Sequence, residues 1–287
     1  MTFTRSLKYL IVIALITIAF QNNARAGGFP VRPGRLILSP SIGYFFASKE
    51  WDSTGRKQSF PGNGKYTSET LSLYAEYGIS RRFSAVATLP FTFNQFNETG
   101  YSAKYSGLTD LETGIKYYLF NINYIYYFSL QGTAITPLYT NPVYGTAPEL
   151  GYDEEGGELK LSAAGTGTLF DRSVYFDASE AVRQYFGNQG PIQDRYQVTG
   201  GITLDKAFKN QISLTFGGLW GESDNKGFNY VNPEQAKNFA FKQLTLSYGH
   251  TFTSRFSTFL SVGQFLTGRN TGDGTSISLA VAYRLFN

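Results

Sequence analysis

The sequence predicts an all-β fold, a transmembrane antiparallel up-and-down β-barrel of about twelve strands. Three observations predict it: polar and apolar residues alternate along many segments, short and long connections alternate between these segments, and an export signal precedes them. This combination is typical of barrels that cross a membrane with strands, with short periplasmic turns and longer extracellular loops.

The first 26 residues have the features of a secretory signal peptide. Arg5 and Lys8 form a basic start, Tyr9–Phe20 is an apolar run of 12 residues, and the motif ARA at residues 24–26 resembles a cleavage site. The apolar run is too short for a comfortable helical span. We therefore expect 1–26 to be a cleaved signal peptide and 27–287 to form the barrel, with an uncleaved anchor as the alternative.

The composition excludes several kinds of site. The chain has no Cys and one His, which excludes disulfides, thiol catalysis, Cys-ligated zinc and His-rich metal sites. Three basic residues and no acidic residue lie in the predicted signal peptide. The remainder of the chain therefore contains 22 Lys and Arg and 21 Asp and Glu. The basic character of the whole chain is therefore no argument for a nucleic-acid partner.

Alternation with a period of two residues is strong after residue 27. In Thr70–Ile79, Gln211–Trp220 and Ser276–Leu285, every second residue is apolar or glycine. No apolar run of 18 residues follows residue 27, so no helical span is predicted there. The predicted strands are 35–49, 65–79, 82–96, 109–120, 122–137, 156–170, 173–186, 192–205, 208–221, 238–251, 255–268 and 274–286.

The connections between these segments support a barrel. Five short turns are expected at 80–81, 121, 171–172, 205–207 and 253–254, and six longer loops at 50–64, 97–108, 138–155, 187–191, 222–237 and 269–273. With an even number of strands, this count places both ends of the barrel domain on the short-turn side. We predict that this side is the periplasm of a Gram-negative bacterium.

A membrane explains why such strands would close on themselves. Lipid cannot satisfy backbone N–H and C=O groups, so a sheet that spans a bilayer must have no free edge. A soluble β-sandwich would also show alternation, but its strands are usually shorter than the roughly 14 residues expected here. Aromatic residues near strand ends suit the two interfacial girdles of an outer-membrane barrel; the candidates are Phe45, Phe46, Trp51, Phe96, Phe120, Tyr124, Trp220 and Phe252.

The end of the chain resembles the C-terminal signal of outer-membrane proteins. Ser278, Ala280, Tyr283 and Leu285 could fill its polar, small and hydrophobic positions, although Ala280 stands where Gly is usual and two residues extend past the pattern. The resemblance implies the barrel-assembly machinery as a partner. Outer-membrane lipids and lipopolysaccharide are the other expected partners, and we expect a monomer.

The residues that could carry catalysis do not form a convincing site. His250 has the spacing of Leu244, Leu246 and Tyr248, so we expect it on the lipid-facing side near a short turn, without the nucleophile a hydrolase needs. The acidic stretch at 153–158 fits no calcium-loop pattern and reads best as a solvated loop. Asn270–Ser276 reads as a hairpin loop. We predict no enzyme activity, no metal and no cofactor.

Period-two spacing also predicts which charged residues face the interior. Both signs occur in similar numbers, which argues against a pore with rings of one sign; the charges could instead pair and fill part of a narrow lumen. Glu180 would face lipid unless a bulge between 177 and 180 shifts it. The candidate lumen-lining residues are Glu76, Arg82, Asp110, Glu112, Lys116, Glu158, Lys160, Asp177, Arg183, Arg195 and Arg284.

Pro40 and Pro90 lie inside predicted strands. Each removes one backbone donor from a ladder, so each is a candidate strand kink or bulge. A kink could open a lateral gap between lumen and bilayer, and a plain bulge is the alternative.

Two segments, 81–93 and 105–120, resemble a family of bacterial outer-membrane proteins described as the MetA-pathway of phenol degradation family. The second segment carries most of a G-L-G-D-L-x-L-G-x-K-Y pattern, with Thr109 and Thr113 departing from it. The resemblance covers about a tenth of the chain and implies a barrel similar to long-chain fatty acid transporters, with uptake of hydrophobic or aromatic compounds. The matching residues are Gly107, Leu108, Asp110, Leu111, Gly114, Lys116 and Tyr117.

The function predicted from these observations is a passive outer-membrane channel or transporter for small molecules, and the family resemblance implies that these include hydrophobic or aromatic molecules. A structural barrel plugged by its own side chains is the main alternative, because twelve strands are compatible with either. An outer-leaflet enzyme is the less favoured alternative.

Overall fold

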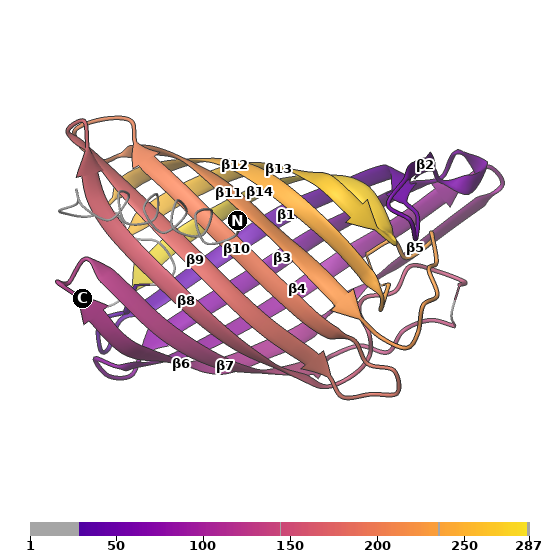
Figure 1. Cartoon of the computed structure of the whole chain (residues 1–287), viewed down its shortest axis with the longest axis horizontal. Coiled ribbons are helices and arrows are strands. Elements are labelled where there is room, and N and C mark those ends of the chain that lie inside the picture. The colour runs from indigo at the N-terminus through magenta and orange to yellow at the C-terminus, as the bar shows by residue number, and fades with distance from the viewer. Residues whose placement is uncertain (1–28, 144, 235, 286–287) are drawn as a thin grey trace, which may run out of the picture.

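A computed structural model of the chain describes residues 29–143, 145–234 and 236–285. The predicted signal peptide, 1–26, lies outside the described residues. The described part forms one closed antiparallel β-barrel (Figure 1), in which β14 pairs with β1 to complete the circle. The predicted fold class is confirmed.

Twelve strands make the wall of the barrel, and two additional strands, β2 (Lys57–Ser59) and β5 (Tyr101–Leu108), extend it at the long-loop end. A 3-10 turn, η1 (Pro61–Asn63), follows β2. The wall strands are β1 (Leu36–Trp51), β3 (Lys65–Gly78), β4 (Phe83–Glu98), β6 (Asp110–Ile122), β7 (Tyr126–Pro137), β8 (Gly156–Leu169), β9 (Arg172–Tyr185), β10 (Ile192–Thr203), β11 (Asn210–Glu222), β12 (Phe239–Thr253), β13 (Phe256–Arg269) and β14 (Thr271–Leu285).

Each predicted strand has a counterpart within a few residues, and three details differ. β5 lies in the segment expected as the loop 97–108, because it pairs with the outer end of β4. Asn270 alone connects β13 to β14, where 269–273 was expected as a loop. β7 begins at Tyr126 because Asn123 and Tyr124 adopt positive φ angles and form the preceding turn.

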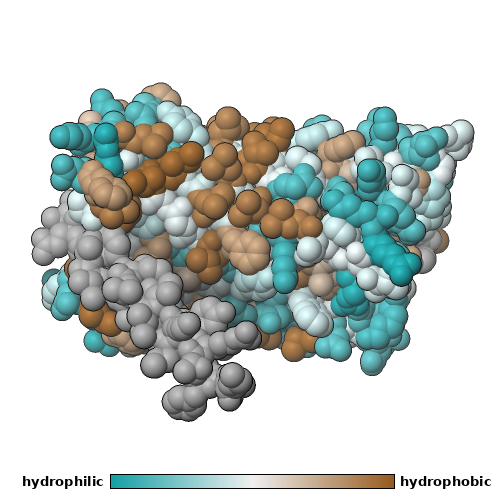
Figure 2. All heavy atoms as spheres, turned by 45° about the horizontal axis from the view of Figure 1, so that its top comes forward, coloured by the Kyte–Doolittle hydropathy of each residue, from teal (hydrophilic) through white to brown (hydrophobic). Residues whose placement is uncertain are grey.

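The two faces of the wall differ as the alternation predicts. Ile42, Leu73, Ile115, Leu214 and Leu279 are all 44–50% exposed, although large aliphatic side chains are usually buried in soluble proteins. Figure 2 shows hydrophobic side chains gathered over the middle of the visible face and hydrophilic ones toward the long-loop end. This distribution is typical of a wall that meets lipid around its middle.

Within the described residues, the structure has no helix that is both long and apolar enough to cross a membrane.

Candidate functional site

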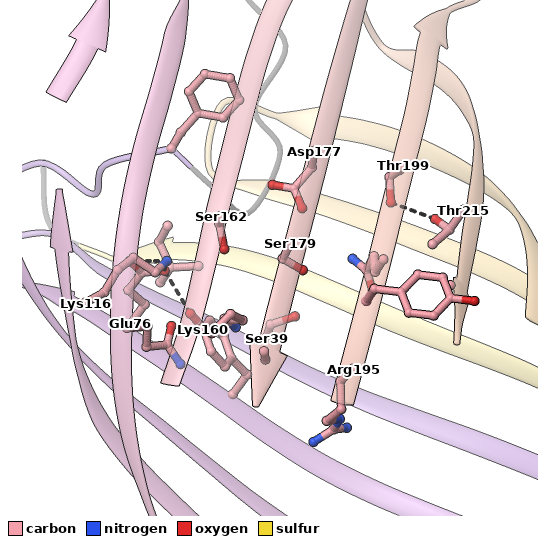
Figure 3. A pocket seen from close by; sticks show the side chains of 18 of the residues that line it. Ser39, Glu76, Lys116, Lys160, Ser162, Asp177, Ser179, Arg195, Thr199 and Thr215 are labelled. Carbon is pink, nitrogen blue, oxygen red and sulfur yellow. Dashed lines mark hydrogen bonds and ion pairs between the residues drawn. The ribbon is translucent and has the colours of Figure 1, made fainter. Parts of the chain in front are cut away.

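The interior of the barrel holds a cavity of about 820 Å³. Inward-facing side chains of most wall strands line it, together with the segment Phe29–Arg35 that precedes β1. Figure 3 shows small polar residues, among them Ser162 and Ser179, pointing into this space from neighbouring strands. Because these side chains are short, they leave room that larger residues would fill. We call this space the main cavity.

A buried ion pair stands on one side of the main cavity. Lys116 on β6 donates to both carboxylate oxygens of Glu76 on β3, at 2.9 and 3.0 Å, and only about 5% of each side chain is exposed. The hydroxyl of Tyr74 donates to the same carboxylate at 2.8 Å, and the hydroxyl oxygen of Tyr118 lies 3.1 Å from it. A buried ion pair with this many hydrogen bonds is fully satisfied, so it fixes the separation of β3 and β6.

A second network crosses four strands and centres on Arg183 of β9. Its guanidinium contacts Glu112 of β6 at 2.6 Å and Glu158 of β8 at 2.8 Å. Arg195 of β10 reaches the same Glu158 carboxylate at 3.2 Å. Asp110 continues the network, since it accepts hydrogen bonds from the hydroxyls of Tyr139 and Tyr185. The sequence alternation could indicate that these charges share a face but not which of them pair.

A smaller cavity of about 220 Å³ lies beyond this network, toward the long loops. Arg183, Arg195, Leu219 and Phe241 line both cavities, so these side chains form the boundary between them. Three phenylalanines contribute to the wall of the smaller cavity, which we call the outer chamber: Phe239, Phe241 and Phe265.

Two long loops, 138–155 and 223–238, fold together over the outer chamber and form what we call the outer cap. The backbone N–H of Glu149 donates to the side-chain oxygen of Asn232 at 2.5 Å, and Lys237 forms an ion pair with Glu154 at 2.8 Å. Asn94 on the wall donates to the carbonyl of Glu149 at 2.7 Å. The cap is therefore attached both across its two loops and to the wall.

An aromatic cluster fills the barrel beneath and beside the cap. Phe96 and Tyr66 are essentially inaccessible to solvent, and Val231 of the cap packs against the cluster. Phe241 and Phe265 stack with ring centroids 4.1 Å apart. The rings of this cluster narrow the long-loop end of the barrel, and Phe241 and Phe265 also line the outer chamber. The buried members are Phe45, Ala47, Phe60, Tyr66, Phe96, Val231 and Phe265.

Glu234 is the titratable group of the cap that stands out. It lines the outer chamber, and burial raises the pKa of its carboxyl to about 7, while a hydrogen bond with Tyr66 acts in the opposite direction. Burial also raises the pKa of Glu149, and the charge of Lys237 partly offsets this. The carboxyl of Glu234 therefore changes charge near neutral pH.

The segment before β1 enters the opposite end of the barrel. The hydroxyl of Tyr118 donates to the carbonyl of Phe29 at 2.8 Å, and Val31 is buried. Gly78 lies directly against this segment: a Cβ there would stand 2.3 Å from the carbonyl oxygen of Arg32. The segment contributes Arg32 and Arg35 to the main cavity. Sequence reasoning missed both, because the segment has no periodicity that predicts its direction.

The structure distributes the predicted lumen residues over three places. Arg82 lies in the turn between β3 and β4, is exposed, and donates to the hydroxyl of Tyr117 at 3.1 Å. Asp110 lies beside the outer chamber. The other nine lie around the main cavity: Glu76, Glu112, Lys116, Glu158, Lys160, Asp177, Arg183, Arg195 and Arg284. Their role in transport stays a prediction.

Glu180 keeps the orientation that its spacing predicts. β9 pairs with β8 and β10 in continuous register from Val174 to Gln184, so no bulge shifts it inward. It is exposed on the outer face of the wall.

The two prolines occupy different surroundings. Pro40 and Pro90 both keep continuous register with β3. Between β1 and β14, however, the recorded pairs stop at Leu38 and resume at Ser41. Pro90 lies where β4 exchanges its partner β6 for β5, and the N–H of Thr109 donates to its carbonyl at 3.0 Å.

The residues considered for catalysis or metal binding do not converge. The imidazole Nδ1 of His250 lies 2.7 Å from the side-chain oxygen of Asn210, and its ring contacts Phe252 edge-on. Among the residues that the structure describes, no group of three or more His, Asp or Glu is placed to hold a metal ion. Glu154 and Glu158 of the acidic stretch form separate ion pairs with Lys237 and Arg183.

Comparison with known proteins gives structural likeness without a sequence relative. No protein-family model matches the chain, and no curated protein sequence matches it. The barrel is similar to the COG4313 outer membrane channel from Pseudomonas putida F1, with a TM-score of 0.68 and 15% identity over 92% of this chain and 100% of that chain.

The barrel is also similar to the β domain of the Bordetella autotransporter Brka, with a TM-score of 0.52 and 13% identity over 86% of this chain and 99% of that chain. At these identities the likeness shows a shared barrel fold alone. The resemblance to the phenol-degradation family stays a prediction.

Proposed function

We propose that the protein is an outer-membrane channel through which small molecules diffuse passively. The observation that carries the proposal is the main cavity of about 820 Å³ inside a closed barrel. Its lining of Ser, Thr, Gln and charged residues is hydrated readily, while the outside of the wall is apolar. An apolar exterior around a polar interior is the arrangement of membrane channels.

The location and orientation belong to the same proposal. The export signal, the apolar belt and the short turns at one end favour the outer membrane, with the short turns in the periplasm. The barrel-assembly machinery, lipids and lipopolysaccharide are the expected partners, and a monomer is the expected state, since the wall closes without a second chain.

Conductance across a planar bilayer and solute uptake into liposomes test the proposal. Purified protein should give discrete single-channel currents and should pass small solutes in a size-dependent manner. An impermeable barrel across a panel of ions, sugars and amino acids would overturn it.

The finer proposal is that the solutes include hydrophobic or aromatic compounds. It rests on the family resemblance and on the phenylalanines of the outer chamber. A liposome panel that pairs aromatic with aliphatic solutes of equal size tests it, with faster aromatic uptake as the expected result. Equal rates would remove the finer proposal and leave the channel intact.

A plugged structural barrel is the second candidate, and one observation favours it. The aromatic cluster and the outer cap lie across the long-loop end, and in this candidate they block the passage of solutes. The same bilayer recordings separate the two candidates, because a permanently plugged barrel gives no current in any state.

A further inference from the structure

The charges around the main cavity are not balanced. Counting the cationic side chains gives seven, and counting the carboxylates gives four, which leaves an excess of three positive charges. The sequence had suggested similar numbers of each sign; Arg32 and Arg35 join the cavity, while Arg82 and Asp110 lie elsewhere. The seven are Arg32, Arg35, Lys116, Lys160, Arg183, Arg195 and Arg284; the four are Glu76, Glu112, Glu158 and Asp177.

Three of the four carboxylates are already neutralised by close partners. Glu76 is paired with Lys116, while Glu112 and Glu158 both contact Arg183. Asp177 lies four residues before Ala181 on β9, nearer the short-turn end. The excess of positive charge is therefore carried by cationic side chains other than Lys116 and Arg183, which neutralise these three carboxylates.

Two of these side chains, Lys160 and Arg195, lie on either side of a small residue. Strand pairing aligns Lys160 on β8 with Ala181 on β9, and Ala181 with Arg195 on β10. Two strand spacings separate the flanking backbones by about 10 Å. All three residues line the main cavity, although Ala181 is only 5% exposed, and the carboxylate of Glu158 lies 3.2 Å from Arg195.

Both cations retain donors for a ligand. The side chain of Arg195 is 38% exposed, and its contact at 3.2 Å is with a Glu158 carboxylate that Arg183 already holds more closely. Lys160 has no recorded hydrogen bond or ion pair with another residue in the described part of the chain, and it lines the cavity. An ammonium and a guanidinium with unused N–H groups bind carboxylates through charge-assisted hydrogen bonds.

Neutral donors lie beside the two cations. Ser162 follows Lys160 by two residues, and Ser179 precedes Ala181 by two, so strand pairing places both serines side by side one step toward the short turns. Figure 3 shows them facing the same space as Arg195. Hydroxyl groups beside two cations add donors without adding negative charge.

We propose that the lumen selects anions and that Lys160 and Arg195, on the wall of the main cavity, form a binding site for the carboxylate of a small organic anion. This inference rests on the proposed channel function and names its substrate class. The low-dielectric wall of the barrel strengthens the field of the three excess charges, so anions concentrate in the main cavity while cations are repelled.

Reversal potentials in planar bilayers under a tenfold KCl gradient test the selectivity. The protein should pass chloride several-fold more readily than potassium. Lys160→Gln and Arg195→Gln should each move the permeability ratio toward one. Lys242→Gln is the matched control, because Lys242 is exposed and lies between Phe241 and Gln243, which face the cavity. Cation preference, or variants that behave like the control, would overturn the inference while leaving a channel.

Binding of benzoate to the detergent-solubilised protein provides a test that needs no current. Saturation-transfer NMR should detect benzoate on the unaltered protein, and the Lys160→Gln/Arg195→Gln double variant should bind about tenfold more weakly or worse. Lys160→Gln disturbs no recorded ion pair, so it keeps the test valid if Arg195→Gln folds poorly. Benzoate binding without any current would support the site and overturn the channel; benzoate binding unchanged in the variants would overturn the site.

Discussion

The two ends of the lumen are built from the same twelve strands and are filled in opposite ways. Toward the short turns, inward positions carry small polar residues such as Ser162, Ser179 and Thr199, and a cavity remains. Toward the long loops, inward positions carry Phe45, Tyr66 and their aromatic neighbours, and only the outer chamber of about 220 Å³ remains. The size of the inward side chains, rather than the fold, therefore decides where the barrel is open.

The ion-pair network around Arg183 lies where these two regions meet. Arg183 and Arg195 line both cavities, and Arg183 connects carboxylates from two other strands. The comparison teaches that the closed end is stabilised by apolar packing and the open part by charges. Substitutions at the long-loop end should therefore lower stability through lost apolar packing, and substitutions around the main cavity should do so through lost ion pairs.

Removing an aromatic ring from the closed end should have the largest effect. Phe96→Ala deletes a side chain with no solvent exposure that contacts the rings of Phe60 and Tyr230. Urea denaturation in micelles should show a loss of about 3–5 kcal/mol in the free energy of unfolding. Bilayer recordings of the same variant should show a higher conductance. Phe93→Ala on the same strand is the control, since Phe93 is 46% exposed on the outside. Equal losses in both variants would show that the cluster does not close the barrel.

Breaking the buried ion pair of the open part should cost slightly less. Glu76→Gln removes the charge that Lys116 faces, and a loss of about 3 kcal/mol is expected, because a buried cation then lacks its counter-ion. Adding Lys116→Gln should restore part of the stability. Glu69→Gln on the same strand, at an exposed site, should stay within about 0.5 kcal/mol of the unaltered protein. A double variant no more stable than Glu76→Gln would contradict the pairing.

The closed end should respond to pH through Glu234. Its pKa is raised from 4.5 to about 7 in the folded cap, so the neutral form is favoured there. The stabilising contribution is fully present below pH 4.5 and is lost as the pH rises through 7. Channel open probability should therefore rise from pH 5 to pH 8, and Glu234→Gln should flatten this dependence. Glu222→Gln, at an exposed site at the end of β11, should leave the pH dependence of the open probability unchanged. If this dependence persists in Glu234→Gln, a group other than Glu234 is responsible for it.

The segment before β1 offers a milder change at the open end. In Gly78→Val the new side chain would collide with the backbone of Arg32, so the segment Phe29–Arg35 should leave its place. Faster trypsin cleavage after Arg35, which precedes Leu36, is the expected readout, together with increased conductance. Gly200→Val is the control because a Cβ there meets nothing within 4 Å. Cleavage at the rate of the control would mean that Gly78 does not hold the segment.

His250→Ala should have the smallest effect. The substitution removes one partly buried hydrogen bond with Asn210 near a short turn, so a loss of about 1 kcal/mol and unchanged conductance are expected. Assays with phospholipid and ester substrates should give the same background for the variant and the unaltered protein. Hydrolysis that disappears in the variant would revive the enzyme alternative.

The fold could be predicted from sequence because one wall face meets a polar lumen and the other an apolar surrounding. Every strand therefore alternates polar and apolar residues with a period of two. This spacing predicts from the sequence that Glu76, Glu112, Lys116 and Arg195 face inward, and all four line the main cavity. The three charged residues of segment 105–120, Asp110, Glu112 and Lys116, have three different sets of partners in the structure.

The remaining features depend on contacts that alternation does not encode. The outer cap forms through single hydrogen bonds such as that of Glu149 with Asn232, between loops about 80 residues apart. Arg32 and Arg35 reach the cavity on an irregular segment, and Arg82 turns away because it lies in the turn between two strands. The charge balance of the lumen therefore became visible only in three dimensions.

Thiol labelling from one side of a bilayer tests the contrast between the two regions most directly, because the chain contains no cysteine of its own. Ser179→Cys places a thiol in the main cavity, and Phe265→Cys places one in the aromatic cluster. A membrane-impermeant thiol reagent should modify Ser179→Cys rapidly from the short-turn side and Phe265→Cys at least tenfold more slowly. Equal protection of both thiols would mean that the lumen is plugged throughout, and it would contradict the account.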